Sequence, residues 1–183
     1  YKQHDAFMPD GREPIYQLVK KLANVPGFKY ENYRIFQEGD LVVAHGRYIG
    51  WKPIPQVIFD IFRVKNGKLV EHWSNLQDET PKNQTASGRG MLDGPTKANQ
   101  YDKTNANKQV AVNFLTDVLI NHQFDKLSNY YNGDVLAQHN PHVPDHVSGL
   151  VKTVQAWAAQ KIFMSYTKIH TVVAEGNFVF TRS

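Results

Sequence analysis

Asp60 is an acidic residue inside an otherwise apolar stretch of the sequence. It stands between Phe59 and Ile61 in the run Val-Ile-Phe-Asp-Ile-Phe. An ionised carboxylate among apolar side chains is costly, so this group either stays protonated or is firmly paired. A carboxyl group of this kind can serve as a general acid or base. We therefore take Asp60 as the leading catalytic candidate; the alternative is a structural aspartate bonded to backbone or to Arg47 or Arg63.

Two histidines, His45 and His72, are the candidate partners of Asp60. An imidazole near the acid would polarise a carbonyl group or tune the carboxyl group. Residues of a strand alternate between its two faces, so His45 shares a face with Val43 and Arg47. Each histidine also has a purely structural interpretation. The pairing of the strands decides which of them lies opposite the acid.

The dipeptide Asn66-Gly67 predicts a hairpin between the two strands that carry Asp60 and His72. A two-residue loop would pair Asp60 with Trp73. A three-residue loop with Gly67 as a bulge would pair it with His72. The three residues that end at Gly67 fit a type I turn followed by a left-handed glycine, so we favour the bulged register.

Two further histidines each precede an aspartate by six residues: His4 precedes Asp10, and His139 precedes Asp145. Such pairs invite an acid–base or metal interpretation. The spacing crosses a proline-containing turn and matches neither helical i,i+4 ligation nor a zinc motif. Turn formation and capping explain the aspartates equally well. The chain has no cysteine, which excludes thiolate ligands, and we expect no metal.

The sequence contains an internal repeat. The segment Gln-His-Asp with Pro-Asp at residues 3–10 recurs as Gln-His-Asn with Pro-Asp at residues 138–145, at an offset of 135. The tight turn at residues 38–40 recurs at 175–177, at an offset of 137. Two matches in the same order indicate duplication.

The repeat predicts the organisation of the chain. Residues 1–78 form a first copy that lacks the helices preceding its Gln-His segment. Residues 79–106, rich in Pro, Gly, Asn, Thr and Lys, form a linker. Residues 107–183 form a second copy that lacks its last strands.

Helical periodicity marks residues 12–23 and 149–160 as equivalent helices, the second with Ser148 as a cap. It marks further helices within residues 107–131. Strand patterns follow at 30–37, 41–49, 57–64, 68–77 and 178–183. Helices followed by an antiparallel meander predict an α+β fold with helices on one face of a bent sheet.

Two segments resemble a known family. Residues 60–73, DIFRVKNGKLVEHW, resemble the hairpin signature of SnoaL-like proteins, which belong to the nuclear transport factor 2-like superfamily. Residues 138–145, QHNPHVPD, resemble the segment before the third helix of that family. The resemblance covers nearly the whole chain.

The resemblance implies a cone-shaped fold in which helices close a curved antiparallel sheet around a pocket, and the repeat implies that this fold is duplicated. Relatives include polyketide cyclases, ketosteroid isomerases, dehydratases and pocket proteins without known activity, so the fold alone does not define function. It matches Asp60 to an acid that faces the cavity in cyclases and isomerases; His45 and His72 remain its candidate partners, and no organic cofactor is expected. The pocket lining that it implies consists of His4, Phe62, Trp73, Ser74, His139 and Asp145.

This sequence departs from the family pattern at two positions. Ser74 stands where the SnoaL-like pattern usually has an aspartate after His-Trp. Arg182 in the second copy stands where the first copy has His45. Both departures weigh against catalysis.

The charge pattern and hydropathy limit the partners. Lysines and arginines give a net charge of +4 but are scattered, so we expect no nucleic-acid partner. No apolar run is long enough to span a membrane. The first residues lack a charged start followed by an apolar run, so no signal peptide is expected, and we expect a cytoplasmic protein that forms a homo-oligomer.

Two functions remain open. The first is an enzyme that transfers a proton at a carbon next to a carbonyl group, or closes a ring by aldol-type chemistry, on a small apolar compound. The second is a module without catalysis that binds a small ligand or mediates dimerisation.

Overall fold

The computed structural model describes residues 1–5 and 7–183, and it confirms the predicted α+β class. The described residues form two compact units. The first contains Tyr1–Glu79 and Gly94–Asn99; the second contains Thr80–Asp93 and Gln100–Ser183. The stretch predicted as a linker is therefore divided between the two units.

The first unit is built on a five-stranded mixed sheet with the strand order β1-β5-β4-β3-β2. The strands are β1 (Lys2–Gln3), β2 (Lys29–Glu38), β3 (Leu41–Ile49), β4 (Gln56–Lys65) and β5 (Lys68–Asp78). β1 runs parallel to β5, and the other neighbours are antiparallel. The central strands hold the core, where Val43, Ile58 and Ile61 are at most 2% exposed.

The hairpin of β4 and β5 has neither of the two predicted registers. Asn66 and Gly67 form a two-residue turn with φ values of 51° and 71°, as Asn-Gly favours. A bulge then leaves Val70 without a Cα partner, because Arg63 pairs with Glu71 whereas its neighbour Val64 pairs with Leu69. The extra residue shifts the strand so that Asp60 pairs with Ser74.

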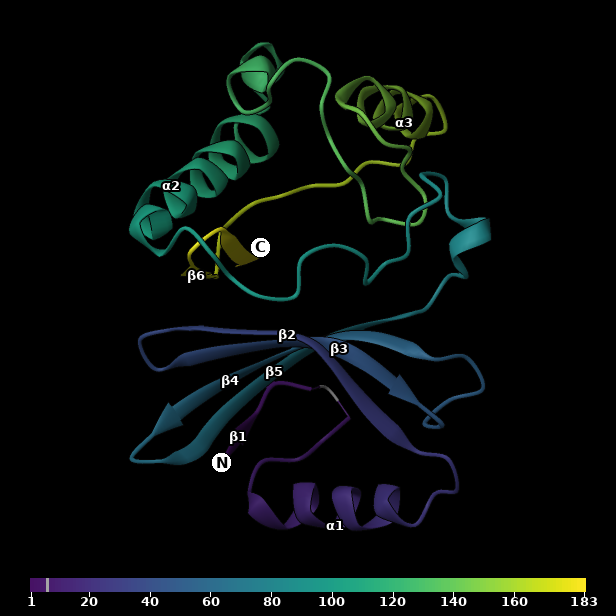
Figure 1. Ribbon diagram of the computed structural model, residues 1–183, viewed down its shortest axis with the longest axis vertical. Helices are drawn as coiled ribbons and strands as arrows, with labels where there is room; N and C mark the ends of the chain where they lie inside the picture. The colour runs from purple at the N-terminus through teal and green to yellow at the C-terminus, as the bar shows by residue number, and fades with distance from the viewer. Residues whose placement is uncertain (6) are drawn as a thin grey trace. The chain divides into compact units, whose positions relative to one another are not determined.

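Helix α1 (Arg12–Ala23) lies along one face of this sheet (Figure 1). Its bounds match the predicted helix, and Pro14 lies in its first turn, where a missing amide hydrogen is harmless. The apolar residues Ile15, Leu18 and Leu22 are only half-buried, and no residue of α1 is fully buried. The helix thus covers the sheet incompletely.

The second unit combines helices with a two-stranded sheet. Its elements are η1 (Lys82–Gln84), η2 (Tyr101–Lys103), α2 (Thr104–Phe114), η3 (Leu115–Ile120), η4 (Phe124–Asn129), α3 (Val147–Ala159), β6 (Thr171–Glu175) and β7 (Phe178–Arg182). Thr104 Oγ1 and Asn107 Nδ2 bond the backbone of Gly176 at 2.8 and 2.9 Å, which fixes α2 at the β6–β7 turn. The helix predicted at 149–160 is α3, but its cap differs: Ser148 donates its amide to Asp134 Oδ1 at 2.7 Å.

A side-chain-stabilised turn precedes α1. The Gln3 amide donates to Asp10 Oδ1 at 2.7 Å. Gln3 Oε1 in turn accepts the amides of His4 at 3.0 Å and Asp5 at 3.3 Å. The turn ends at Gly11, the residue before the first residue of α1.

The same turn precedes α3 in the second unit. The Gln138 amide donates to Asp145 Oδ1 at 2.8 Å. Gln138 Oε1 accepts the amides of His139 at 3.0 Å and Asn140 at 2.9 Å. Each of these bonds matches one of the first turn at an offset of 135.

The residues that open α1 and α3 also share an unusual backbone. Gly11 has φ 102° and ψ 167°, and its amide bonds Tyr1 O at 2.8 Å. His146 has φ 74° and ψ 150°, and its amide bonds Leu136 O at 2.8 Å. Few residues other than glycine adopt this region, so the agreement is informative.

The hairpins β2–β3 and β6–β7 agree in register. Every pair of β6–β7 corresponds to a pair of β2–β3 at an offset of 137. Gly39 and Gly176 turn them with φ values of 60° and 58°. The helix, turn and hairpin of the two units are therefore alike in type and hydrogen bonding.

Candidate functional site

Asp60 is buried in the middle of β4 and firmly paired. Only 5% of the residue is exposed. Its Oδ1 lies 2.9 Å from Nε2 of His72, which is 9% exposed, and its Oδ2 accepts the Tyr48 hydroxyl at 3.3 Å. Of the two states expected for a carboxyl group in this apolar strand, the structure has the paired one.

The contact between Asp60 and His72 is diagonal across the hairpin. Asp60 pairs with Ser74, and His72 pairs with Phe62, two positions along β4. Alternate residues of paired strands share one face of a sheet, here called the Asp60 face. Phe62 stacks on the His72 ring with centroids 4.7 Å apart and holds its plane.

Gln3 completes a chain of polar groups on this face. Its Oε1 lies 2.9 Å from Nδ1 of His72. The two residues are paired in the parallel ladder of β1 and β5, and the His4 amide bonds the His72 carbonyl at 3.0 Å. The turn before α1 thereby reaches the buried acid through a histidine.

Aromatic residues enclose the Tyr48 side of the acid. Tyr48 lies 4.9 Å from Tyr30, 5.8 Å from Phe28 and 5.2 Å from Trp51, measured between ring centroids. A Cβ atom at Gly46 would lie 2.7 Å from the Tyr30 hydroxyl, so only glycine there lets that ring cross β3.

Three tyrosines take part in the electrostatics of Asp60. Burial, and then the negative charge of Asp60, raise the pKa of Tyr30 to about 12. The same two causes raise the pKa of Tyr1 and of Tyr48. All three hydroxyl groups therefore stay protonated at neutral pH and are available as hydrogen-bond donors.

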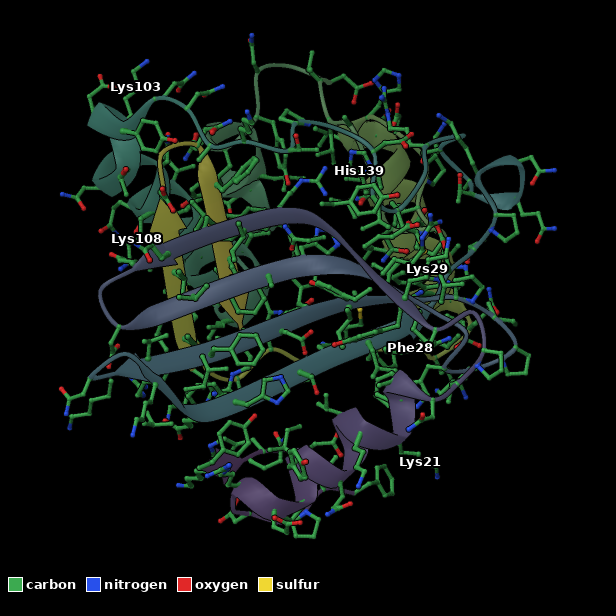
Figure 2. All side chains as sticks on the ribbon, turned by 60° about the horizontal axis from the view of Figure 1, so that its bottom comes forward. Lys21, Phe28, Lys29, Lys103, Lys108 and His139 are labelled. Carbon is green, nitrogen blue, oxygen red and sulfur yellow. The ribbon has the colours of Figure 1, made fainter. Side chains whose placement is uncertain are left out.

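Both ends of α1 are anchored on the Asp60 face. At its start, Gly11 bonds Tyr1, whose ring stacks 6.5 Å from His72. After its end, Phe28 lies where the chain enters the sheet and stacks on Tyr48 (Figure 2). The helix is therefore attached at both ends to the face of the sheet that carries the acid.

His45 is not a partner of Asp60, contrary to one of our expectations. It pairs with Phe59, the sequence neighbour of the acid, and therefore points to the opposite face. Its ring stacks on Phe59 at 3.9 Å, and its Nδ1 accepts a bond from Arg34 Nη1 at 3.2 Å. Its expected companions Val43 and Arg47 do share that face.

The residues implied as pocket lining are also divided by strand alternation. Phe62 and Ser74 lie on the Asp60 face. Trp73 pairs with Ile61 and lies on the opposite face, where His4 stacks on it at 4.8 Å. His4 and Trp73 therefore do not line a site around Asp60.

The arginines named as structural partners of Asp60 bind other acids. Arg63 bonds Glu71 at 2.9 Å and Asp40 at 2.7 Å. Arg47 bonds Glu31 at 2.6 Å and Glu79 at 3.0 Å. The interpretation of Asp60 as the partner of an arginine is wrong.

The second unit holds the other two implied lining residues. His139 Nδ1 lies 2.8 Å from Gly90 O. Asp145 bonds Arg89 at 2.8 Å, and the pKa of Asp145 is lowered by the Gln138 amide and by Arg89. These contacts stabilise the turn.

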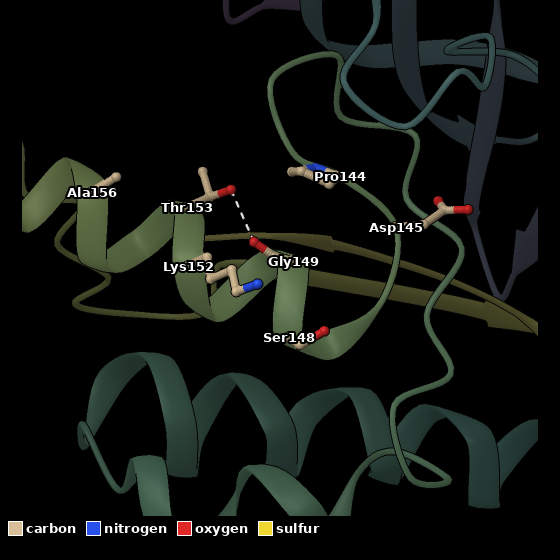
Figure 3. Close-up of a pocket in the computed structure, with 7 residues that line it drawn as sticks. All are labelled: Pro144, Asp145, Ser148, Gly149, Lys152, Thr153 and Ala156. Atoms are coloured by element: carbon tan, nitrogen blue, oxygen red, sulfur yellow. Dashed lines mark hydrogen bonds between the residues drawn. The ribbon is translucent and has the colours of Figure 1, made fainter.

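A hollow of about 460 Å³ lies beside α3 in the second unit (Figure 3). It is lined by Pro144, Asp145, Ser148, Gly149, Lys152, Thr153 and Ala156. Thr153 donates its hydroxyl to the Gly149 carbonyl at 3.0 Å. Lys152 is the one cation among these lining residues. Asp145 is the one expected site residue there.

Sequence analysis missed Gln3, Tyr30 and Tyr48. The repeat contained a signal for the first, because the glutamine begins both copies of the turn. The tyrosines are brought to the acid by the β2–β3 register and by Gly46, which no local pattern indicates.

Among the described residues, no cluster of three or more potential ligands could hold a metal ion, and no helix is long and apolar enough to cross a membrane. A scan against protein-family models finds no match to the chain, and a search of curated proteins finds none either. The function must therefore be argued from the site itself.

Proposed function

We propose that the first unit binds a small, mostly apolar carbonyl compound and transfers a proton at the carbon next to its carbonyl group. Asp60 exchanges the proton, and His72 tunes the acid. The chemistry needs neither a metal nor an organic cofactor. Aldol-type ring closure begins with the same proton abstraction and belongs to the same proposal.

The buried pair of Asp60 and His72 is the observation that carries this proposal. A carboxyl group and an imidazole 2.9 Å apart can hand a proton between them without a net change in charge. Their burial excludes water, which strengthens such interactions and protects an enolate from it. The aromatic rings around Tyr48 suit an apolar substrate.

The proposal is supported by the hairpin sequence of the first unit, residues 60–73, which resembles the signature of SnoaL-like proteins and includes Asp60. We infer that the two units are copies of one such module and that each derives from a cone-shaped fold around a pocket. The matching turns, helix starts and hairpin registers support the duplication. Ser74 opposite Asp60 supplies a hydroxyl group where the family pattern has a second acid.

Proton transfer can be tested without knowing the physiological substrate. The chain is incubated in D₂O with cyclohexanone, 2-cyclohexenone, acetophenone and similar small ketones, and deuterium uptake next to the carbonyl group is followed by NMR. We expect uptake above the buffer rate for at least one ketone, and its loss in the variant Asp60→Asn. The control Asp40→Asn removes a surface carboxylate that bonds Arg63 and should leave the rate unchanged.

A module that binds without catalysis is the second candidate. The complete pairing of Asp60 with His72 and Tyr48 favours it, since a satisfied acid needs no substrate. Val19 and Ile35, at 57% and 62% exposure, also favour assembly of the module into a homo-oligomer. Ketone binding by calorimetry without deuterium uptake would select ligand binding, and a dimer in sedimentation without ketone binding would select assembly.

A further inference from the structure

The turn before α1 determines which nitrogen of His72 carries a proton. Gln3 Oε1 lies 2.9 Å from His72 Nδ1, and the same oxygen accepts the amides of His4 and Asp5. A backbone N–H group can only donate, so the side-chain atom at this position must be the oxygen and not the NH₂ group. An oxygen that accepts can bond Nδ1 only if Nδ1 carries a hydrogen.

The proton count at Asp60 follows from this assignment. With Nδ1 protonated, a neutral His72 presents a lone pair at Nε2, and Asp60 must then hold the proton of the 2.9 Å bond. A cationic His72 instead donates from Nε2 to an ionised Asp60. In both cases one proton lies between Oδ1 and Nε2, and the pair has no net charge.

With the other tautomer of His72, the pair of Asp60 and His72 would hold one proton fewer. A neutral His72 protonated only at Nε2 would donate to an ionised Asp60, and the pair would carry a net negative charge. Its Nδ1 lone pair would then face the Gln3 oxygen, which is unfavourable. Gln3 therefore disfavours this state.

We propose that Gln3 is a positioning residue that holds His72 in the Nδ1–H form and so keeps a transferable proton at Asp60. It acts through His72 and touches no substrate. Asp10 holds the Gln3 backbone at 2.7 Å, and Phe62 fixes the ring plane, so the acceptor and the imidazole are both placed by the fold. The predicted effect on the rate rests on the proposed proton-transfer function. The assignment of the His72 tautomer rests only on the contacts of Gln3.

Long-range ¹H–¹⁵N correlation spectra of the ¹⁵N-histidine-labelled chain test this directly. His72 is assigned from the signals lost in His72→Gln. We expect a protonated Nδ1 at neutral pH in the unmodified chain. In Gln3→Leu we expect the neutral ring to move to the Nε2–H form, and any ketone exchange to fall by roughly 10-fold to 100-fold, the usual effect of such an orienting group.

Two further variants distinguish an effect of Gln3 on the His72 tautomer from an effect on folding. Gln138→Leu removes the equivalent side chain of the second turn, which bonds the amides of His139 and Asn140 but no imidazole among the described residues, and should leave His72 unchanged. Gln3→Glu keeps an accepting oxygen and should keep the Nδ1–H form even where Gln3→Leu does not fold. A neutral His72 protonated at Nε2 in the unmodified chain would overturn the proposal, as would Nδ1 protonation that persists in a folded Gln3→Leu. Retained Nδ1–H form without any ketone exchange would refute only the proton-transfer function.

Discussion

His72 Nε2 lies 2.9 Å from Asp60 Oδ1 although the two residues are not paired in the sheet. The bulge at Val70 shifts β5 by one residue and sets His72 diagonal to the acid. Without that shift, Trp73 would oppose Asp60. The bulge therefore creates the contact on which the site depends.

Removal of one partner from this buried pair should destabilise the first unit. We expect His72→Leu to lower the free energy of unfolding by about 3 kcal/mol, because among the described residues it leaves the buried Asp60 carboxyl group with the Tyr48 hydroxyl as its side-chain partner. The double variant Asp60→Leu with His72→Leu should be less destabilised than His72→Leu alone. Urea unfolding followed by circular dichroism measures both.

His4→Leu is the matched control for that experiment. His4 contacts Glu71 at 2.7 Å with a side chain that is 32% exposed. A solvent-exposed pair contributes less than about 1 kcal/mol. A loss as large as that of His72→Leu would contradict the special role of the buried pair.

Tyr30 should titrate abnormally in alkaline solution. Its pKa is raised from 10.0 to about 12, so the stability that it contributes is complete below pH 10 and is lost as the pH rises toward about 12. Asp60→Asn removes the smaller of the two causes, and the Tyr30 pKa should fall but stay above 10 because burial remains. Tyrosinate absorbance checks this, with Tyr30→Phe to identify the signal. An unchanged Tyr30 pKa in Asp60→Asn would show that the charge of Asp60 does not act on Tyr30.

The backbone at the start of α1 gives a test of the duplication. Gly11 has a φ of 102°, and an added Cβ atom would meet nothing closer than 3.9 Å, so Gly11→Ala should act through conformation alone. We expect it to cost roughly 1–3 kcal/mol. His146→Gly at the matching position of α3 should stabilise the second unit in thermal unfolding. A destabilising His146→Gly would argue against the equivalence.

Local structure could be predicted from the sequence where a pattern among neighbouring residues is enough to define a helix or a turn. The periodicity of residues 12–23 defined α1, and Asn66-Gly67 defined the β4–β5 turn. Asp60 was recognised because an acid among apolar strand residues demands an explanation. These features depend on neighbours in the chain.

Other features of the site depend on pairing between distant segments. The Val70 bulge follows no local rule, and one residue of register decides whether Trp73 or His72 shares the face of Asp60. His45 was assigned to the site although strand alternation places it on the opposite face. Gln3 reaches His72 only because β1 adds to the sheet edge in parallel.

Deuterium uptake by a small ketone in the presence of the unmodified chain and of Asp60→Asn tests the central claim most directly. The asparagine keeps the shape of the side chain and removes the group that exchanges the proton. We predict that the rate for the most reactive ketone of the panel falls by roughly 100-fold or more, while Asp40→Asn keeps the full rate. Equal rates for the unmodified chain and Asp60→Asn would contradict proton transfer at this site.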